Sequence, residues 1–208
     1  LDECKEFGTL QFAHLARSAF IAVSFLKEGV KEKWLSKKAF NEFMESIRTV
    51  SHDFAYDSIQ VSNGKMVREK FIEKYGHLRP GTYDILSPSY SENPEKFLNP
   101  ISKKNTDISI NDVEIDNWEG EKKYFFDKIR ALGFNYSDSD FECFLRLSIE
   151  GREKGKFLFC YNLSKALSML KDFSKLYNIE IENISNITIK DIFNIIKNGK
   201  SDRIIQKR

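Results

Sequence analysis

The sequence predicts an all-α protein: an irregular helical bundle with one proline-rich, extended segment. Apolar residues recur along most of the chain at the i, i+3, i+4, i+7 spacing of one helix face. All four prolines lie between residues 80 and 100, where they remove backbone donors and fix φ. The chain of 208 residues also contains 18 phenylalanines, which is enough apolar volume for a substantial core.

The first predicted helix runs from Phe7 to Lys27, and Gly29 is placed to end it as a left-handed cap. Its apolar residues fall on two opposite faces, so we expect both faces to be buried. His14 and Arg17 are the large polar residues in its middle. Each is expected either to bond a neighbour within the core or to contact a ligand.

A second helix is predicted after Ser36, a suitable N-cap, with an apolar stripe that continues to Phe54. The pair Ser51–His52 is superficially similar to a phosphorylatable-histidine motif. A mid-helix imidazole, however, lacks the open approach that phosphoryl transfer needs, so no catalytic role is expected. A turn at Asn63–Gly64 precedes a short third helix, which Gly76 is placed to stop.

Three more helices are predicted in the second half of the chain. The first of them is closed by Gly133, and a capping box at Ser137–Asp140 opens the next and longest one. That helix is expected to end near Tyr177. A second capping box, at Thr188–Asp191, predicts a final short helix.

The predicted organisation is N-terminal helices with the proline-rich segment at 1–100, a linker at 101–117, C-terminal helices of the same helical domain at 118–198, and a basic tail at 199–208. The linker is polar and acidic and lacks helical periodicity. Ile108, Ile110 and Val113 are compatible with a short edge strand within it. Because the first residue is not methionine, we expect the chain to be a piece of a longer protein.

The composition excludes several classes of protein. Thirty-three basic residues nearly cancel 31 acidic ones, and a net charge of +2 argues against a nucleic-acid partner. Cys4, Cys143 and Cys160 form no Cys-x-x-Cys pair, and the histidines lack metal-ligand spacing, so no metal site is expected. No apolar run approaches the length of a membrane span, and no signal peptide precedes Leu1. We therefore expect a cytoplasmic protein with reduced thiols and no membrane partner.

The candidate substrate-binding residues come from two stretches: His77, Arg79, Tyr83 and Asp84 in the proline-rich segment, and Arg152, Glu153 and Lys156 in the longest helix. An ordered, non-helical segment with charged and aromatic residues is a common place for function on a helical scaffold.

Arg152 lies at the centre of an apolar helix stripe, so its charge must be paired. The partner is expected to be Asp84, Glu153 or a ligand anion. Gly151 and Gly155 flank this turn, as if another backbone or a ligand came close to it. We predict that the 77–84 segment lies against the 152–156 turn and forms a polar pocket with it.

These stretches resemble a known family. Tyr75–Pro88 (YGHLRPGTYDILSP), continuing to Tyr90 and to Glu92–Pro94, resembles the YGHRxPxExDIxxPRWxExP-type segment of phosphoenolpyruvate-synthase-like phosphotransferases. That group includes relatives of pyruvate phosphate dikinase and the rifampin phosphotransferases. Gly151–Phe157 (GREKGKF) is similar to the RExxKF helix of the same proteins, and Leu15–Phe20 (LARSAF) fits their first helix. The resemblance covers most of the chain, and the first motif is the most specific.

The resemblance implies the central helical region of such an enzyme, between an ATP-grasp domain and a phosphohistidine domain. Those domains are the implied partners, with a small-molecule phosphoryl acceptor as the implied ligand. ATP and Mg²⁺ are implied only for the ATP-grasp domain, so no cofactor is expected in this chain. Leu78–Arg79, Thr82 and Ser89 depart from the family pattern, which points to a subgroup other than the rifampin phosphotransferases.

The sequence thus predicts a helical substrate-docking or linker domain that is not catalytic alone. It contains no Gly-rich phosphate loop and no glycine-flanked Ser/Thr-His motif. The alternative is a non-enzymatic helical module for protein–protein interaction. A self-sufficient enzyme is not expected, because no nucleophile–base pair is visible.

Overall fold

The computed structural model describes residue 2, residues 4–97 and residues 114–199, and this part of the chain is helix and turn without a strand. The prediction of an all-α bundle is confirmed. In chain order, the elements are the π-helix η1 (Cys4–Thr9) and the α-helices α1 (Leu10–Lys31), α2 (Lys37–Ser46), α3 (Val50–Ser62), α4 (Arg68–Tyr75), α6 (Asp116–Ala131), α7 (Asp138–Leu176), α8 (Ile181–Ile184) and α9 (Ile189–Asn198).

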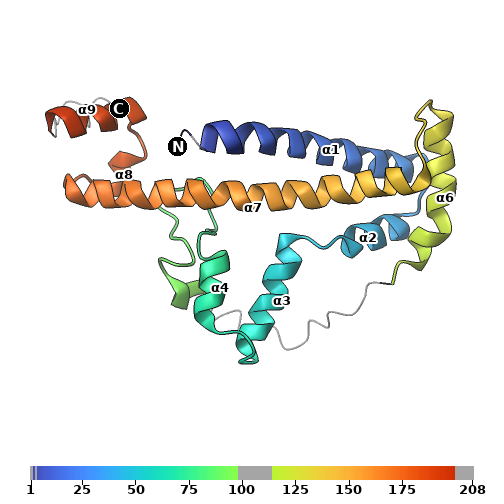
Figure 1. The fold of residues 1–208 in the computed structure, drawn as a ribbon, viewed down its shortest axis with the longest axis horizontal. Helices are drawn as coiled ribbons and strands as arrows, with labels where there is room; N and C mark the ends of the chain where they lie inside the picture. Colours follow the sequence, from blue (N-terminus) through green and yellow to red (C-terminus); the bar gives the residue numbers. More distant parts are fainter. Residues whose placement is uncertain (1, 3, 98–113, 200–208) are drawn as a thin grey trace.

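Helix α7 is the axis of the fold, and the other elements pack along it (Figure 1). Its 39 residues correspond to about 58 Å of helix. Helix α1 runs antiparallel beside it, α6 crosses its N-terminal end, and α3 and α4 lie across α7 from α1. Helices α8 and α9 lie at its C-terminal end. The described residues therefore form an elongated bundle organised along one helix.

The main core lies where α1, α2, α6 and α7 meet, and it is rich in aromatic residues. Trp118 of α6 is fully buried, with its ring centroid 4.2 Å from that of Phe43. Phe126 and Phe141 pack edge-on at 5.5 Å. Buried aromatic rings contribute both large apolar area and favourable edge contacts, so this cluster supplies much of the driving force for folding.

Three predicted N-caps and two predicted glycine ends are confirmed. Ser36, Ser137 and Thr188 each accept a hydrogen bond from the backbone N–H three residues later, at 3.0, 3.1 and 3.2 Å. Gly133 adopts a φ of 97° after α6, and Gly64 a φ of 68° after α3. Such backbone conformations favour glycine, so these residues fix where the helices stop.

Gly29 does not cap α1, contrary to the prediction. The helix continues to Lys31, and Lys33 adopts the left-handed conformation with a φ of 60°. A Cβ atom on Gly29 would lie 2.6 Å from the ring of Phe125 on α6. The glycine therefore permits the close approach of α6 to α1.

The expected burial of α1 on two faces is also wrong. Leu10 is 57% exposed, and Phe20, predicted to be buried, is 61% exposed. Helix α7 covers one face of α1, and the described part of the chain leaves much of the opposite face open to solvent. Contrary to the sequence-based expectation, Cys4–Lys31 is long and apolar enough to cross a membrane. The core helix of a soluble protein passes the same test of length and composition.

The predicted second helix is two helices. Helix α2 ends at Ser46, Ile47 has an extended ψ of 118°, and α3 begins at Val50. The Ser46 hydroxyl donates to the carbonyl of Phe43 at 2.8 Å, which competes with helix continuation. His52 consequently lies exposed in the first turn of α3, and not mid-helix as predicted.

The proline-rich segment is packed as expected, but it is folded into turns and not extended. Two backbone hydrogen bonds close it: Tyr90 N–H to Leu78 O at 2.8 Å and Ser91 N–H to Gly76 O at 2.9 Å. We call residues 76–91 the closed loop. Residues 94–97 form a helical turn that begins at Pro94, where a missing N–H costs nothing.

The predicted linker ends too late, because α6 already begins at Asp116. Glu42 of α2 caps α6, since its carboxylate accepts from the backbone N–H of Asn117 at 2.9 Å and of Trp118 at 3.1 Å. Residues 101–113, including the suggested edge strand, lie outside the described residues. So does the basic tail after Gly199.

Candidate functional site

His77 anchors the closed loop to α7. Its Nε2 lies 3.1 Å from the carbonyl oxygen of Phe157, and its ring centroid lies 4.6 Å from that of Phe157 and 5.2 Å from that of Tyr161. Because a carbonyl can only accept, Nε2 carries the proton. Burial lowers the pKa of the imidazole, which favours its neutral form. Its buried Nδ1 has no hydrogen-bond partner among the described residues.

Arg79 is the buried cation of the site, with a side chain only 1% exposed. Its Nη2 donates to the Ser164 hydroxyl of α7 at 2.9 Å, and its Nη1 donates to the Ser87 carbonyl at 2.9 Å. Its Nη2 also lies 3.7 Å from Glu92 Oε1. One guanidinium thus joins both arms of the closed loop to α7, as its planar fork of donors allows.

Glu92 completes this polar network, although it was not among the predicted site residues. Its carboxylate accepts from Lys171 Nζ at 2.7 Å and from the Ser168 hydroxyl at 2.7 Å. Burial alone would raise the pKa of Glu92, but these bonds and one from the Ser89 N–H hold it at about 2. Glu92 lies in the first motif of the family resemblance, so the sequence could have indicated it as a site residue. Nothing in the sequence indicated Ser164 beyond its small size.

Tyr83 and Asp84 lie at the outer side of the closed loop. Tyr83 is 65% exposed. Asp84 is exposed, and its Oδ1 accepts from the Leu86 backbone N–H at 2.9 Å. That bond is a local turn contact, so Asp84 stabilises the bend of its own loop.

Arg152 pairs with Glu153 at 2.8 Å, which confirms one predicted partner and rules out Asp84 in this structure. Its guanidinium carbon lies 5.6 Å from the ring centroid of Phe20 on α1. The side chain is 38% exposed. The prediction that Arg152 joins the 77–84 segment is therefore wrong, because this position of α7 faces α1 and not the closed loop.

A neighbour does come close at Gly151 and Gly155, but it is not the backbone or ligand that was predicted. A Cβ atom on Gly155 would lie 2.7 Å from Leu15 of α1, and one on Gly151 would lie 3.2 Å from the same side chain. The group that comes close is thus an apolar side chain of α1. These glycines serve packing between the two long helices.

The closed loop does meet α7, over residues 153–160. A cavity of about 280 Å³ lies between the loop, α7 and the start of α3. Both motifs behind the family resemblance contribute to its walls. Its lining residues are Val50, Ser51 and Phe54 of α3, Leu78, Thr82 and Tyr90 of the closed loop, and Glu153, Lys156, Phe157 and Cys160 of α7.

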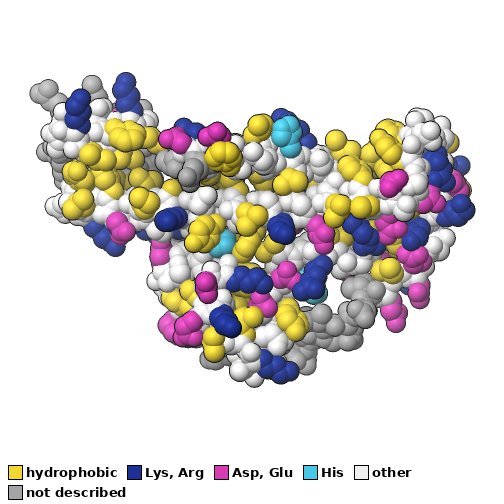
Figure 2. Space-filling view, viewed as in Figure 1, with side chains coloured by type: hydrophobic (Ala, Val, Ile, Leu, Met, Phe, Trp, Pro, Cys, Tyr) yellow, Lys and Arg dark blue, Asp and Glu magenta, His cyan; other side chains and the backbone are white. Residues whose placement is uncertain are grey.

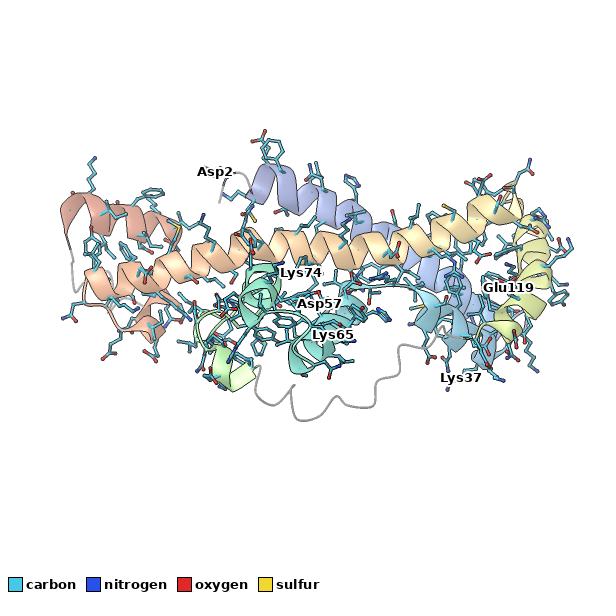
Figure 3. All side chains as sticks on the ribbon, turned by 60° about the horizontal axis from the view of Figure 1, so that its bottom comes forward. Asp2, Lys37, Asp57, Lys65, Lys74 and Glu119 are labelled. Atoms are coloured by element: carbon cyan, nitrogen blue, oxygen red, sulfur yellow. The ribbon has the colours of Figure 1, made fainter. Side chains whose placement is uncertain are left out.

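A second polar cluster joins α3 to α4 (Figure 3). Asp57 is 7% exposed, and its Oδ2 accepts from Lys74 Nζ at 2.8 Å and from the Tyr75 hydroxyl at 2.8 Å. Burial raises the pKa of Tyr75 to about 12, so its hydroxyl remains a donor. The buried carboxylate of Asp57 thus has two donors from α4, which fits a structural role in holding α4 against α3.

The described residues contain no group of three or more His, Cys, Asp or Glu side chains arranged to hold a metal ion. Cys4, Cys143 and Cys160 are all free thiols. Burial raises the pKa of the Cys160 thiol, which opposes formation of a reactive thiolate.

No protein-family model, no curated protein and no solved structure matches the chain.

Proposed function

We propose that the chain is the helical substrate-docking domain of a cytoplasmic phosphoenolpyruvate-synthase-like phosphotransferase. One observation carries the proposal: the two motifs that suggested the family line one cavity, although residues 95–150 separate them in the chain. Leu78 and Thr82 come from the first motif, and Glu153 and Lys156 from the second. Sequence motifs that meet at a cavity are a sound basis for a binding site.

The network around Arg79 and Glu92 supports this proposal, because it holds the closed loop in one conformation. A wall fixed before the ligand arrives lowers the entropy lost on binding. His77 and Arg79 are then positioning residues behind the wall, whereas Tyr83 and Asp84 are exposed and do not line the cavity.

The domain is not catalytic alone in this proposal. ATP and Mg²⁺ would be held by the flanking ATP-grasp domain, as the family resemblance implies. The phosphohistidine of the other flanking domain would deliver the phosphoryl group to an acceptor held at the cavity.

The test begins with the coding sequence on both sides of this chain. An ATP-grasp domain before it and a phosphohistidine domain after it are expected, and the absence of both would overturn the proposal. In that complete protein, Lys156→Met should leave ATP-dependent histidine phosphorylation intact and reduce transfer to the acceptor at least about tenfold. Lys165→Met, an exposed change on the same helix, is the control. Phosphoryl transfer by the purified 1–208 chain alone would also contradict the proposal.

A protein–protein interaction module is the second candidate, and exposed apolar surface favours it. Phe20 and Ile21 of α1 are 61% and 52% exposed and line a hollow of about 480 Å³ near Trp34. Figure 2 shows further hydrophobic side chains over α9 and the adjacent end of α7. Exposed patches of this kind often mark contact surfaces.

The two candidates predict different sensitive residues. If the interaction module is correct, Phe20→Ser should abolish association with flanking or partner domains, and Lys156→Met should have no effect on function. If the docking domain is correct, Lys156→Met should reduce phosphoryl transfer strongly, and Phe20→Ser should reduce it less.

A further inference from the structure

The inner surface of the cavity between the closed loop, α3 and α7 is mainly apolar. Phe54, Leu78 and Phe157 line it, together with Val50 at the start of α3. Its volume of about 280 Å³ is at the lower limit of small-molecule pockets, which are roughly 300–1,000 Å³. A ligand that fits is therefore compact, about the size of one ring with short substituents.

The charge in this cavity is not balanced. Lys156 is the one basic residue among its described lining residues, and none of the described residues forms an ion pair with it. Glu153 is the one acidic lining residue, and it is already paired with Arg152 at 2.8 Å. A partly buried lysine without an ion-pair partner among the described residues favours a ligand with a negative charge.

Three residues with hydroxyl groups also line the cavity. They are Ser51, Thr82 and Tyr90, and no hydrogen bond joins their hydroxyls to other described residues. Burial raises the pKa of Tyr90, so its hydroxyl stays protonated and can donate.

The start of α3 adds to the same positive potential. Val50 and Ser51 line the cavity, and Thr49 provides no side-chain cap for the first N–H groups of this 13-residue helix. The N-terminal end of a helix carries partial positive charge. Lys156 and this helix end therefore act on a ligand in the same direction.

We propose that this cavity binds a small carboxylic acid with a compact apolar or aromatic body, whose carboxylate pairs with Lys156. A single ammonium balances one carboxylate charge, whereas a phosphate dianion would call for more cations. The inference deepens the proposed function, since the acceptor would then be such an acid. It depends on that function only for this last step, because binding itself requires no flanking domain.

The test measures equilibrium binding to the 1–208 chain without ATP. The probes are 4-fluorobenzoate, its neutral amide, 4-fluorobenzylamine and phenyl phosphate, observed by ¹⁹F NMR and calorimetry. The benzoate should bind at least about tenfold more tightly than the amide, because the amide lacks the charge that pairs with Lys156. The amine should not bind. Phenyl phosphate should bind more weakly than the benzoate.

Variants locate the site. Lys156→Met should weaken benzoate binding at least about tenfold, Lys156→Arg should retain most of it, and Lys165→Met should leave it unchanged. Amide shifts in ¹⁵N NMR should be confined to residues 50–54, 78–90 and 153–160. If Lys156→Met fails to fold, the comparison of the four probes on the unaltered chain still tests whether the cavity prefers a carboxylate.

Equal binding of benzoate and amide would overturn the inference, and so would the absence of benzoate binding at millimolar concentration. Backbone ¹⁵N NMR shifts centred on Phe20 and Trp34 would also overturn the inference, since they would place the probe at the hollow beside α1. Tighter binding of phenyl phosphate would contradict the assignment to carboxylates. Benzoate binding to the 1–208 chain, combined with a coding sequence that contains neither an ATP-grasp nor a phosphohistidine domain, would uphold the cavity and overturn only the proposed function.

Discussion

The two halves of α7 are covered by different kinds of contact. Its N-terminal half lies in the aromatic core, where Trp118, Phe125 and Phe141 are buried by other apolar groups. Its C-terminal half carries the closed loop, which Arg79 and Glu92 hold through charged hydrogen bonds. Apolar contacts are not directional, whereas the polar network requires particular donors and acceptors. The core therefore supplies most of the stability, and the loop network fixes the geometry of the cavity.

The largest loss of stability is expected from the core. Trp118→Ala should lower the free energy of unfolding by about 3–5 kcal/mol, because it removes a fully buried ring and leaves a cavity. Urea denaturation followed by circular dichroism measures this. Trp118→Phe is the control and should lose clearly less. A loss below about 1 kcal/mol for the alanine variant would mean that the aromatic core does not supply most of the stability.

Arg79→Met should cost about 2–3 kcal/mol, because Ser164 and the Ser87 carbonyl lose a charged donor while buried. The effect should be local: amides of the closed loop exchange hydrogen faster, while those of α6 do not. Arg79→Lys should fail to restore protection, since an ammonium lacks the planar fork. Unchanged exchange in the loop would show that the network does not hold it.

Two glycines separate packing from helix propensity. Gly29→Ala should destabilise by about 1–3 kcal/mol, because its Cβ would clash with Phe125 at 2.6 Å. Gly120→Ala in α6 meets open space and should stabilise by about 0.5–1 kcal/mol. Thermal unfolding of both variants measures the difference in sign. Stabilisation by both would mean that α6 does not approach α1 as closely as this structure shows.

The loop network should weaken in acid. The folded-state pKa of Glu92, about 2, lies below its ordinary value of 4.5. Its contribution is therefore present above about pH 4.5 and is lost as the pH falls towards 2. We expect about 1–2 kcal/mol, since Lys171 and Ser168 meet it near the surface.

The matched variant for this acid effect is Glu92→Gln, which removes the titrating group. The stability difference between the unaltered chain and the variant should shrink between pH 5 and pH 2.5, measured by urea denaturation at each pH. A difference that stays constant over this range would contradict the assigned pKa.

The sequence by itself determined the features that depend on neighbouring residues. Ser36, Ser137 and Thr188 begin helices because each side chain reaches an N–H only three residues away. Gly133 and Gly64 end them because glycine tolerates positive φ. The all-α class follows from the apolar spacing. The predicted polar pocket between the 77–84 segment and Arg152 was wrong, because Arg152 pairs with Glu153 and the closed loop meets α7 beside Lys156 in a mainly apolar cavity.

Only the tertiary structure decided which face each helix presents to which neighbour. Periodicity placed Arg152 on an apolar stripe, but α1 covers that face, so the partner is Glu153 and the closed loop lies elsewhere. Gly29 was assigned to a cap because its contact with Phe125 spans distant positions in the chain. The cap of α6 is supplied by Glu42, 75 residues before Asn117. Such pairings depend on how the helices pack together, and local periodicity carries no information about that.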